Sequence, residues 1–227
     1  RRYRPGHFEA PRLSELRARV SLLGVSGAGT EQGGPLELSN MVGEARELHT
    51  RPETEGAVFQ VASQFNCLEF IDASVTPESG VTRYLFDKSQ GPACALACAA
   101  STVWRNYFLP VDPDGPPGQR AGCQLDCLRD VRALLGEGLL EVRNGYASSP
   151  CIEELAERVL GMSEQERDEV RAALRIGVQW DAEVTDVRRE HRKNPETSKW
   201  ETVGIPCPPV TQVFCSAVSI HPRHAKL

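Results

Sequence analysis

The pattern of apolar and polar residues predicts three β-strands, and in the second of them apolar and polar residues alternate cleanly. The three predicted strands span residues 57–63, 175–185 and 210–220. In the second of them, one face is predicted to carry Ile176, Val178, Trp180, Ala182 and Val184. Polar residues stand between these positions, so the other face of that strand is expected to be wet.

Apolar residues at helical spacing predict five helices. The expected ranges are 13–23, 36–49, 93–108, a helix that begins at 152, and one that ends near 174. Ser14 is the expected cap of the first helix, and Ser163 with Glu166 forms a capping box for the last. The helix over 93–108 begins with small apolar residues and should therefore be buried. The pattern over 124–135 is mixed and does not distinguish a helix from a strand.

Three segments have the composition of loops. Residues 24–35 are rich in glycine but lack the Gly-Lys-Ser/Thr of a phosphate loop, which favours a plain connection. Residues 76–92 are rich in turn formers, and residues 186–203 are strongly charged and are expected to be solvated. Because strands and helices interleave along the chain, the sequence predicts an α/β fold with a central sheet. The length of 227 residues favours a single domain, with 1–50 as a helical extension and 51–227 as the core.

The net charge and the lengths of the apolar runs indicate which kinds of partner the protein can be expected to bind. The net charge of −5 argues against a general nucleic-acid or anionic-membrane surface, although it leaves room for a local basic patch. We expect no nucleic-acid partner, no membrane partner and a monomer. No apolar run reaches the roughly 20 residues that a membrane-spanning helix needs. The first residues lack the apolar segment of a signal peptide, so we expect a cytoplasmic protein, with a removed signal left open.

The eight cysteines mostly lie within apolar runs, where cysteine acts as a small hydrophobic residue. We expect reduced thiols and a reducing compartment. Cys94 with Cys98, and Cys123 with Cys127, form two C-x₃-C pairs. Zinc sites usually show a C-x₂-C spacing, so buried thiols are favoured over a metal, and no metal ligand is predicted.

A polar cluster directly follows the predicted strand over 57–63. Gln64 and Asn66 offer amides that could contact a ligand, and Gln90, Gly91 and Pro92 stand at a helix start, where phosphate binds readily. Carboxyl groups follow in the same region at Glu69, Asp72, Glu78 and Asp87. In α/β folds ligands bind beyond strand ends and at helix starts, so these residues predict a binding site.

Each of these residues also has a structural reading. Asn66 could cap a turn, Glu69 could pair with Arg83, and Asp87 could cap the next helix, while Asp72 is better read as solvated. No Ser/His/Asp arrangement and no G-x-S-x-G motif stands out. The five histidines lie in polar or terminal segments, so carboxyl groups are the better candidates for acid/base chemistry.

Five segments resemble, in the same order, parts of the MavL-type macrodomains, a branch of ADP-ribosylhydrolases that act on ADP-ribosylated arginine. The segments are VASQFNCLE, GVTRYLFDKSQGPACALACAASTVWRNYF, NGYA, RIGVQWDAEVT and VTQVFCSAVSI, between about residues 59 and 221. The resemblance implies a three-layer α/β/α macrodomain-like fold with a central mixed sheet. The chain departs from ordinary macrodomains where it has Ser-Gln-Gly-Pro in place of their glycine-rich phosphate segment.

The resemblance also implies a set of site residues for ADP-ribose. Asn66 would face the distal ribose, and the loop over 80–92 with the following helix start would hold the diphosphate. The implied ligand-binding residues are Ser63, Gln64, Phe65, Asn66, Gln90, Gly91, Pro92, Ala93, Cys215, Ser216 and Ala217. The implied catalytic carboxyl groups are Asp87, Glu69 and Glu78.

Hydrolysis of an ADP-ribosyl–arginine bond breaks an N-glycoside. By analogy with glycoside hydrolysis, one carboxylate activates water or stabilises the reacting carbon, and a second acid serves the leaving group. The expected partners are ADP-ribose and an ADP-ribosylated protein, and no cofactor is needed. Two other classes stay open, namely a module that binds ADP-ribose or a nucleotide without turnover, and a structural protein with a buried polar cluster.

Overall fold

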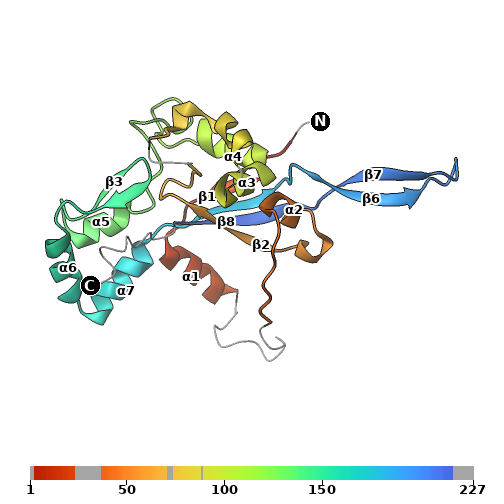
Figure 1. The fold of residues 1–227 in the computed structure, drawn as a ribbon. Helices are drawn as coiled ribbons and strands as arrows, with labels where there is room; N and C mark the ends of the chain where they lie inside the picture. The colour runs from red at the N-terminus through yellow and green to blue at the C-terminus, as the bar shows by residue number, and fades with distance from the viewer. Residues whose placement is uncertain (1–2, 24–36, 71–73, 88, 217–227) are drawn as a thin grey trace.

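The computed structural model describes residues 3–23, 37–70, 74–87 and 89–216, and its centre is a four-stranded mixed sheet (Figure 1). The strand order is β1-β5-β8-β2, with bounds β1 His7–Glu9, β5 Gly177–Ala182, β8 Val210–Ser216 and β2 Val58–Ser63. β2 and β8 are parallel, while β5 is antiparallel to both β8 and β1. Mixed α/β architecture with a mixed sheet is thereby confirmed.

The parallel pair sets the position of the candidate site. Ser63 and Ser216 are partners in the register of β2 and β8, so the carboxyl ends of the two strands meet at one edge of the sheet. The helices α3 (Gln90–Ala97) and α4 (Ala99–Tyr107) lie along one side of the sheet (Figure 1). The start of α3 is therefore brought to the strand ends from a different part of the chain.

The remaining helices surround this centre. They are α1 (Leu13–Leu22), α2 (Ala45–Leu48), α5 (Arg129–Leu135), α6 (Ile152–Leu160) and α7 (Glu164–Ala173), with short 3₁₀ helices at Pro52–Thr54, Pro77–Ser79 and Val81–Phe86. In Figure 1, α5, α6 and α7 gather at the end of the sheet where β2 and β8 finish. None of the described helices is long and apolar enough to cross a membrane.

Several predicted helices are confirmed, and others differ for clear reasons. α1, α6 and α7 are present, and the capping box of Ser163 and Glu166 starts α7. Ser14 does not cap α1, because the helix begins after Arg12. The helix predicted over 36–49 is wrong except for the four residues of α2. The undecided segment 124–135 contains α5.

The helix predicted over 93–108 is broken at Cys98, whose backbone leaves the helical region. Thr185 occupies the break, because its N–H donates to the Ala97 carbonyl and its hydroxyl accepts from the Ala99 N–H. These bonds satisfy the backbone groups that the interrupted helix leaves unpaired. The sequence signal of a continuous helix was therefore overridden by a tertiary contact.

The strand predicted over 175–185 contains β5, but its alternation is wrong at two positions. Gln179 is completely buried and Trp180 is exposed. Gln179 pairs with Gln212, and Ala182 pairs with Val210, so Trp180 and Asp181 together oppose one residue of β8. This β-bulge shifts the side-chain phase by one position.

Three features of the sheet region were not predicted. β1 belongs to the segment taken as a helical extension, and it completes the central sheet, so a division at residue 50 does not match the architecture. β3 (Glu141–Arg143) and β4 (Tyr146–Ser148) form a hairpin around Asn144 and Gly145. The charged segment 186–203, expected to be solvated, is exposed or half-buried along its length, and most of it lies in a second hairpin, of β6 (Val187–Lys193) and β7 (Trp200–Pro206).

The β3–β4 turn is locked onto the loop that follows β2. Gly145 has a φ of +78°, which favours glycine, and a Cβ there would lie 2.6 Å from the amide carbon of Asn66. The Gly145 carbonyl also accepts a 2.8 Å hydrogen bond from the N–H of Phe65. The hairpin and the loop after β2 therefore form one packed unit.

Replacing Gly145 by alanine should destabilise the protein more than the same change at Gly56. Both glycines have positive φ values, but a Cβ at Gly56 would meet nothing within 4 Å. Gly56→Ala isolates the conformational cost, about 1–2 kcal/mol, and Gly145→Ala adds the overlap with Asn66. Urea unfolding of both variants measures the difference, and equal losses would contradict the close packing of the turn against Asn66.

Candidate functional site

A cavity of about 580 Å³ lies at the carboxyl ends of β2 and β8. Its wall combines strand ends, the start of α3, the beginning of α5 and the β3–β4 hairpin. The lining residues are Ala62, Ser63, Gln64, Phe65, Glu69, Phe70, Ser89, Gly91, Pro92, Leu128, Leu140, Gly145, Tyr146, Ala147 and Ser216. Seven residues singled out from the sequence are thus brought to one cavity, namely Ser63, Gln64, Phe65, Glu69, Gly91, Pro92 and Ser216.

Glu69 supplies the only carboxyl group among the described residues that line this cavity. Its side chain is buried, and its Oε1 has no hydrogen-bond partner in the described part of the chain. Burial raises the pKa of Glu69 to about 8, and the nearby cation of Arg105 only partly opposes this shift. Near neutral pH the group is therefore mainly a protonated acid that can donate a proton.

The start of α3 is shaped around this carboxyl group. A Cβ at Gly91 would lie 2.8 Å from Oε2 of Glu69, so glycine allows the carboxyl group to approach the helix backbone. The first turn of a helix presents N–H groups and a partial positive charge. Gly91 therefore places a proton donor beside a helix start that suits an anion.

Asp87 lies at the turn before α3, outside the residues that line the cavity. Its Oδ1 accepts hydrogen bonds from both the N–H and the hydroxyl of Ser89, which does line the cavity. These two bonds lower the pKa of Asp87, so it is a carboxylate at neutral pH. Ser89, and not Asp87, is the N-cap residue of α3, so the capping role considered from the sequence is wrong, and a catalytic role stays a prediction.

Glu78 is placed elsewhere. It is exposed, does not line the cavity, and its Oε1 accepts a 2.6 Å hydrogen bond from the N–H of Ala121. This bond ties the Pro77–Ser79 helix to the loop near residue 121. The geometry therefore gives Glu78 a structural contact and does not bring it to Glu69.

Protein groups, and not a ligand, satisfy the amide of Asn66. Its Nδ2 donates to Gln124 Oε1 over 2.7 Å, and its Oδ1 accepts from the N–H of Leu68 over 3.0 Å. The residue has no exposed surface and does not line the cavity. The expected contact between Asn66 and a ribose does not fit this arrangement, because both polar ends of the amide are already used.

Gln64 lines the cavity but is also bonded internally. Its Oε1 accepts from the N–H of Phe70 over 3.0 Å, and its Nε2 donates to the Tyr146 hydroxyl over 3.3 Å. The backbone of Phe65 is held on both sides, since its N–H donates to Gly145 and its carbonyl accepts from Cys127. These bonds fix the loop after β2, so the cavity wall is preformed there.

The other predicted contacts fall into three groups. Ala93 and Cys215 are near the site in sequence but do not line the cavity. Gln90 begins α3, and nothing is described of its side chain. Ala217 lies outside the described residues, as does Asp72.

Sequence reasoning missed the part of the wall built by distant segments. Phe70, Leu128, Leu140, Tyr146 and Ala147 give the cavity an apolar and aromatic side. The Asn-Gly pair at 144–145 is a strong hairpin signal and could have placed Tyr146 beside a turn. Leu128 and Leu140 carry no comparable signal, because they read as ordinary core positions.

The cysteines and the side chains that could bind a metal ion complete the chemistry of the site. All eight cysteines are free, and the sulfur of Cys67, in the loop after β2, lies 3.6 Å from that of Cys127. Within the described ranges, no group of three or more His, Cys, Asp or Glu side chains is arranged to hold a metal ion.

The raised pKa of Glu69 predicts a specific pH dependence of stability. Between the ordinary value of 4.5 and about 8, the folded protein holds a proton on Glu69 that the unfolded chain has lost. The free energy of unfolding should therefore fall as pH rises through this range, by roughly 3–5 kcal/mol, and level off above it. Glu69→Gln should lack this dependence. Urea unfolding of both proteins at several pH values measures the difference, and parallel curves would contradict the burial of an acid there.

Comparison of the chain with protein-family models, with curated proteins and with solved structures gave no match.

Proposed function

We propose that this protein is a hydrolase that removes mono-ADP-ribose from arginine side chains of proteins, with the ADP-ribose bound in the cavity at the ends of β2 and β8. The proposal includes the three-layer macrodomain-like arrangement implied by the resemblance. The observation that carries it is geometric: Glu69 lies against Gly91 in the first turn of α3, and Asp87 is bonded to Ser89, which lines the same cavity. The pKa values of the two carboxyl groups shift in opposite directions: burial raises the pKa of Glu69 to about 8, and the hydrogen bonds from Ser89 lower the pKa of Asp87. Such a divergence is typical of an acid and a base that share one reaction.

The cavity suits the ligand in size and chemistry. Its volume of about 580 Å³ lies within the usual range for small-molecule sites. Tyr146, Phe65 and Phe70 offer apolar and aromatic surface for a base. The first turn of α3 offers N–H groups for the diphosphate. A protonated Glu69 adds no negative charge that would repel the phosphates.

The reaction can be written with the chain's own groups. Asp87, held by Ser89, stabilises the reacting anomeric carbon or takes a proton from the attacking water. The bond between that carbon and the arginine nitrogen breaks, and the water oxygen bonds to the carbon. Glu69 gives its proton to the leaving nitrogen and is reprotonated from solvent, while Asp87 releases to solvent the proton that it took from the water. The scheme uses no metal and no organic cofactor.

A module that binds ADP-ribose without turnover is the second candidate. The observation in its favour is that Asp87 stands outside the residues that line the cavity. Such a module would use the same wall and the same helix start but would need neither carboxyl group for chemistry.

Calorimetric titration with free ADP-ribose, paired with hydrolysis of an ADP-ribosyl-arginine peptide, tests the proposal. The parent should bind one ADP-ribose and release it from the peptide. Asp87→Asn and Glu69→Gln should keep binding but lose about 100-fold or more in kcat. Glu78→Gln is the matched control and should leave both properties unchanged, because Glu78 does not reach the cavity. No heat at millimolar ADP-ribose would exclude both candidates, and binding without hydrolysis would favour the second.

The pH profile of hydrolysis should follow the two carboxyl groups. Asp87 is ionised throughout the neutral range, so kcat/KM should be nearly constant from about pH 5 to 7. Above pH 8 it should fall about tenfold per pH unit, because Glu69 loses the proton that the leaving group needs. A profile that rises through pH 8 would mean that Glu69 acts as a base and would reverse the roles of the two carboxyl groups.

A further inference from the structure

The β6–β7 hairpin forms an arm that projects from the end of the sheet opposite the cavity (Figure 1). The register pairs His191 with Thr202, Lys193 with Trp200 and Arg189 with Gly204. Directly opposed residues of an antiparallel pair share a face, and alternate residues along a strand share it too. These six residues therefore lie on one face, which we call the basic face of the arm.

The basic face carries cations and no carboxyl group. All six of its residues are exposed. The carboxyl groups of the two strands, at Glu190 and Glu201, lie on the opposite face. Arg188 pairs with Glu190 there, and Asn194 donates to Glu201. The acidic groups are thus occupied on one side of the hairpin, while the cations of the other side face solvent.

Two aromatic rings, of His191 and Trp200, lie on the basic face beside the cations of Arg189 and Lys193. The rings of His191 and Trp200 are stacked, with centroids 5.3 Å apart and planes inclined by 12°. The stack covers one side of the Trp200 ring, yet 65% of the residue is still exposed. Stacking on His191 packs one side of the Trp200 ring against the hairpin, but it does not explain so large an exposed aromatic surface beside two cations.

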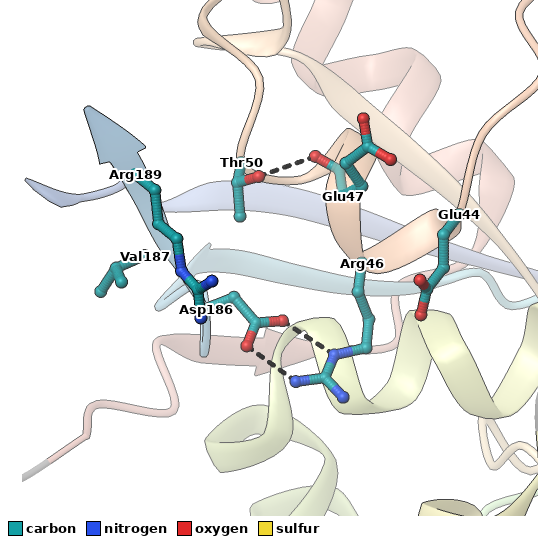
Figure 2. Close-up of a pocket in the computed structure, with 7 residues that line it drawn as sticks. All are labelled: Glu44, Arg46, Glu47, Thr50, Asp186, Val187 and Arg189. Carbon is teal, nitrogen blue, oxygen red and sulfur yellow. Dashed lines mark hydrogen bonds and ion pairs between the residues drawn. The ribbon is translucent and has the colours of Figure 1, made fainter. Parts of the chain in front are cut away.

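At the base of the arm the basic face opens onto a polar cleft of about 360 Å³ (Figure 2). Arg46 and Asp186 neutralise each other there through two hydrogen bonds of 2.8 and 2.7 Å. Arg189 also lines the cleft, and within the described part of the chain no ion pair neutralises it. Glu44 and Glu47 line the same cleft, so the positive charge of the basic face ends at Arg189 and does not continue into the body.

We propose that the basic face of the arm binds single-stranded nucleic acid. Arg189 and Lys193 would contact phosphates, and the exposed ring of Trp200 would stack on a base, the combination by which single strands are bound without sequence preference. The net charge of −5 averages over the whole chain. Residues 187–206 contain five Arg or Lys residues against three glutamates, so the arm is positive although the protein is acidic. The inference stands independently of the proposed hydrolase activity.

The direct test is fluorescence anisotropy with a labelled twelve-residue oligothymidylate at low salt. The parent should bind it with a salt slope of about −1.4, the value for two phosphates neutralised on a single strand. Arg189→Gln with Lys193→Gln should weaken binding about tenfold or more and flatten the slope. Trp200→Ala should weaken binding by a similar factor. Trp200→Phe keeps an aromatic ring and should bind nearly as well as the parent, which would show that the hairpin is intact.

The matched control removes the same charge from the opposite side of the arm. Arg192 lies opposite Glu201 and Lys199 is the partner of Asn194 at the tip, so both belong to the other face. Arg192→Gln with Lys199→Gln should cost at most half of the binding free energy that is lost in the Arg189→Gln, Lys193→Gln variant. Equal losses in the two double variants would overturn the face-specific site. No binding by the parent, or equal binding of a twelve-residue polyglutamate, would overturn the nucleic-acid assignment.

Discussion

The buried guanidinium group of Arg105 is the interaction on which the site depends. The residue has no exposed surface, and its N–H groups donate to the Cys67 carbonyl, to Gln179 and to Thr102, each over 3.3 Å. The guanidinium also lies 3.9 Å from the centre of the Phe214 ring. One cation thereby joins α4, β5, β8 and the loop after β2. Burial of a charge is tolerated only when its donors are satisfied, so these contacts must form together.

The same environment explains the state of Glu69. Removal from water raises its pKa and lowers that of Arg105, and the attraction between the two groups opposes both shifts. Desolvation outweighs attraction for Glu69, so the carboxyl group stays protonated close to a cation. Had the two been in direct contact, the pKa of Glu69 would have fallen and its proton would have been lost. Burial of Glu69 is thus what leaves a proton on the cavity wall.

Much of this site was predictable because it depends on local signals. A strand that ends in polar residues and a glycine at a helix start both follow from sequence, and the parallel register of β2 and β8 brings Ser63 and Ser216 together. Asn66 was misread because its partners, Gln124 and Leu68, depend on how a distant loop returns. Glu78 was misread because closeness in sequence to a site says little inside a loop. The bulge in β5 has no local signal, since a long-range bond between Arg105 and Gln179 accompanies it.

The placement of charge separates the two ends of the molecule. At the carboxyl ends of β2 and β8 the described cavity wall has a single carboxyl group, and that group is protonated near neutral pH, so the wall is almost uncharged. At the opposite end the arm leaves the cations of one face in water. A neutral wall can hold an anion through backbone N–H groups and shape, which favours one small ligand in one pose. Solvated cations act at longer range and tolerate many geometries, which suits a flexible polyanion. In the two proposals the ends of the molecule would therefore bind anions by different means, one by shape and backbone N–H groups and the other by solvated cations.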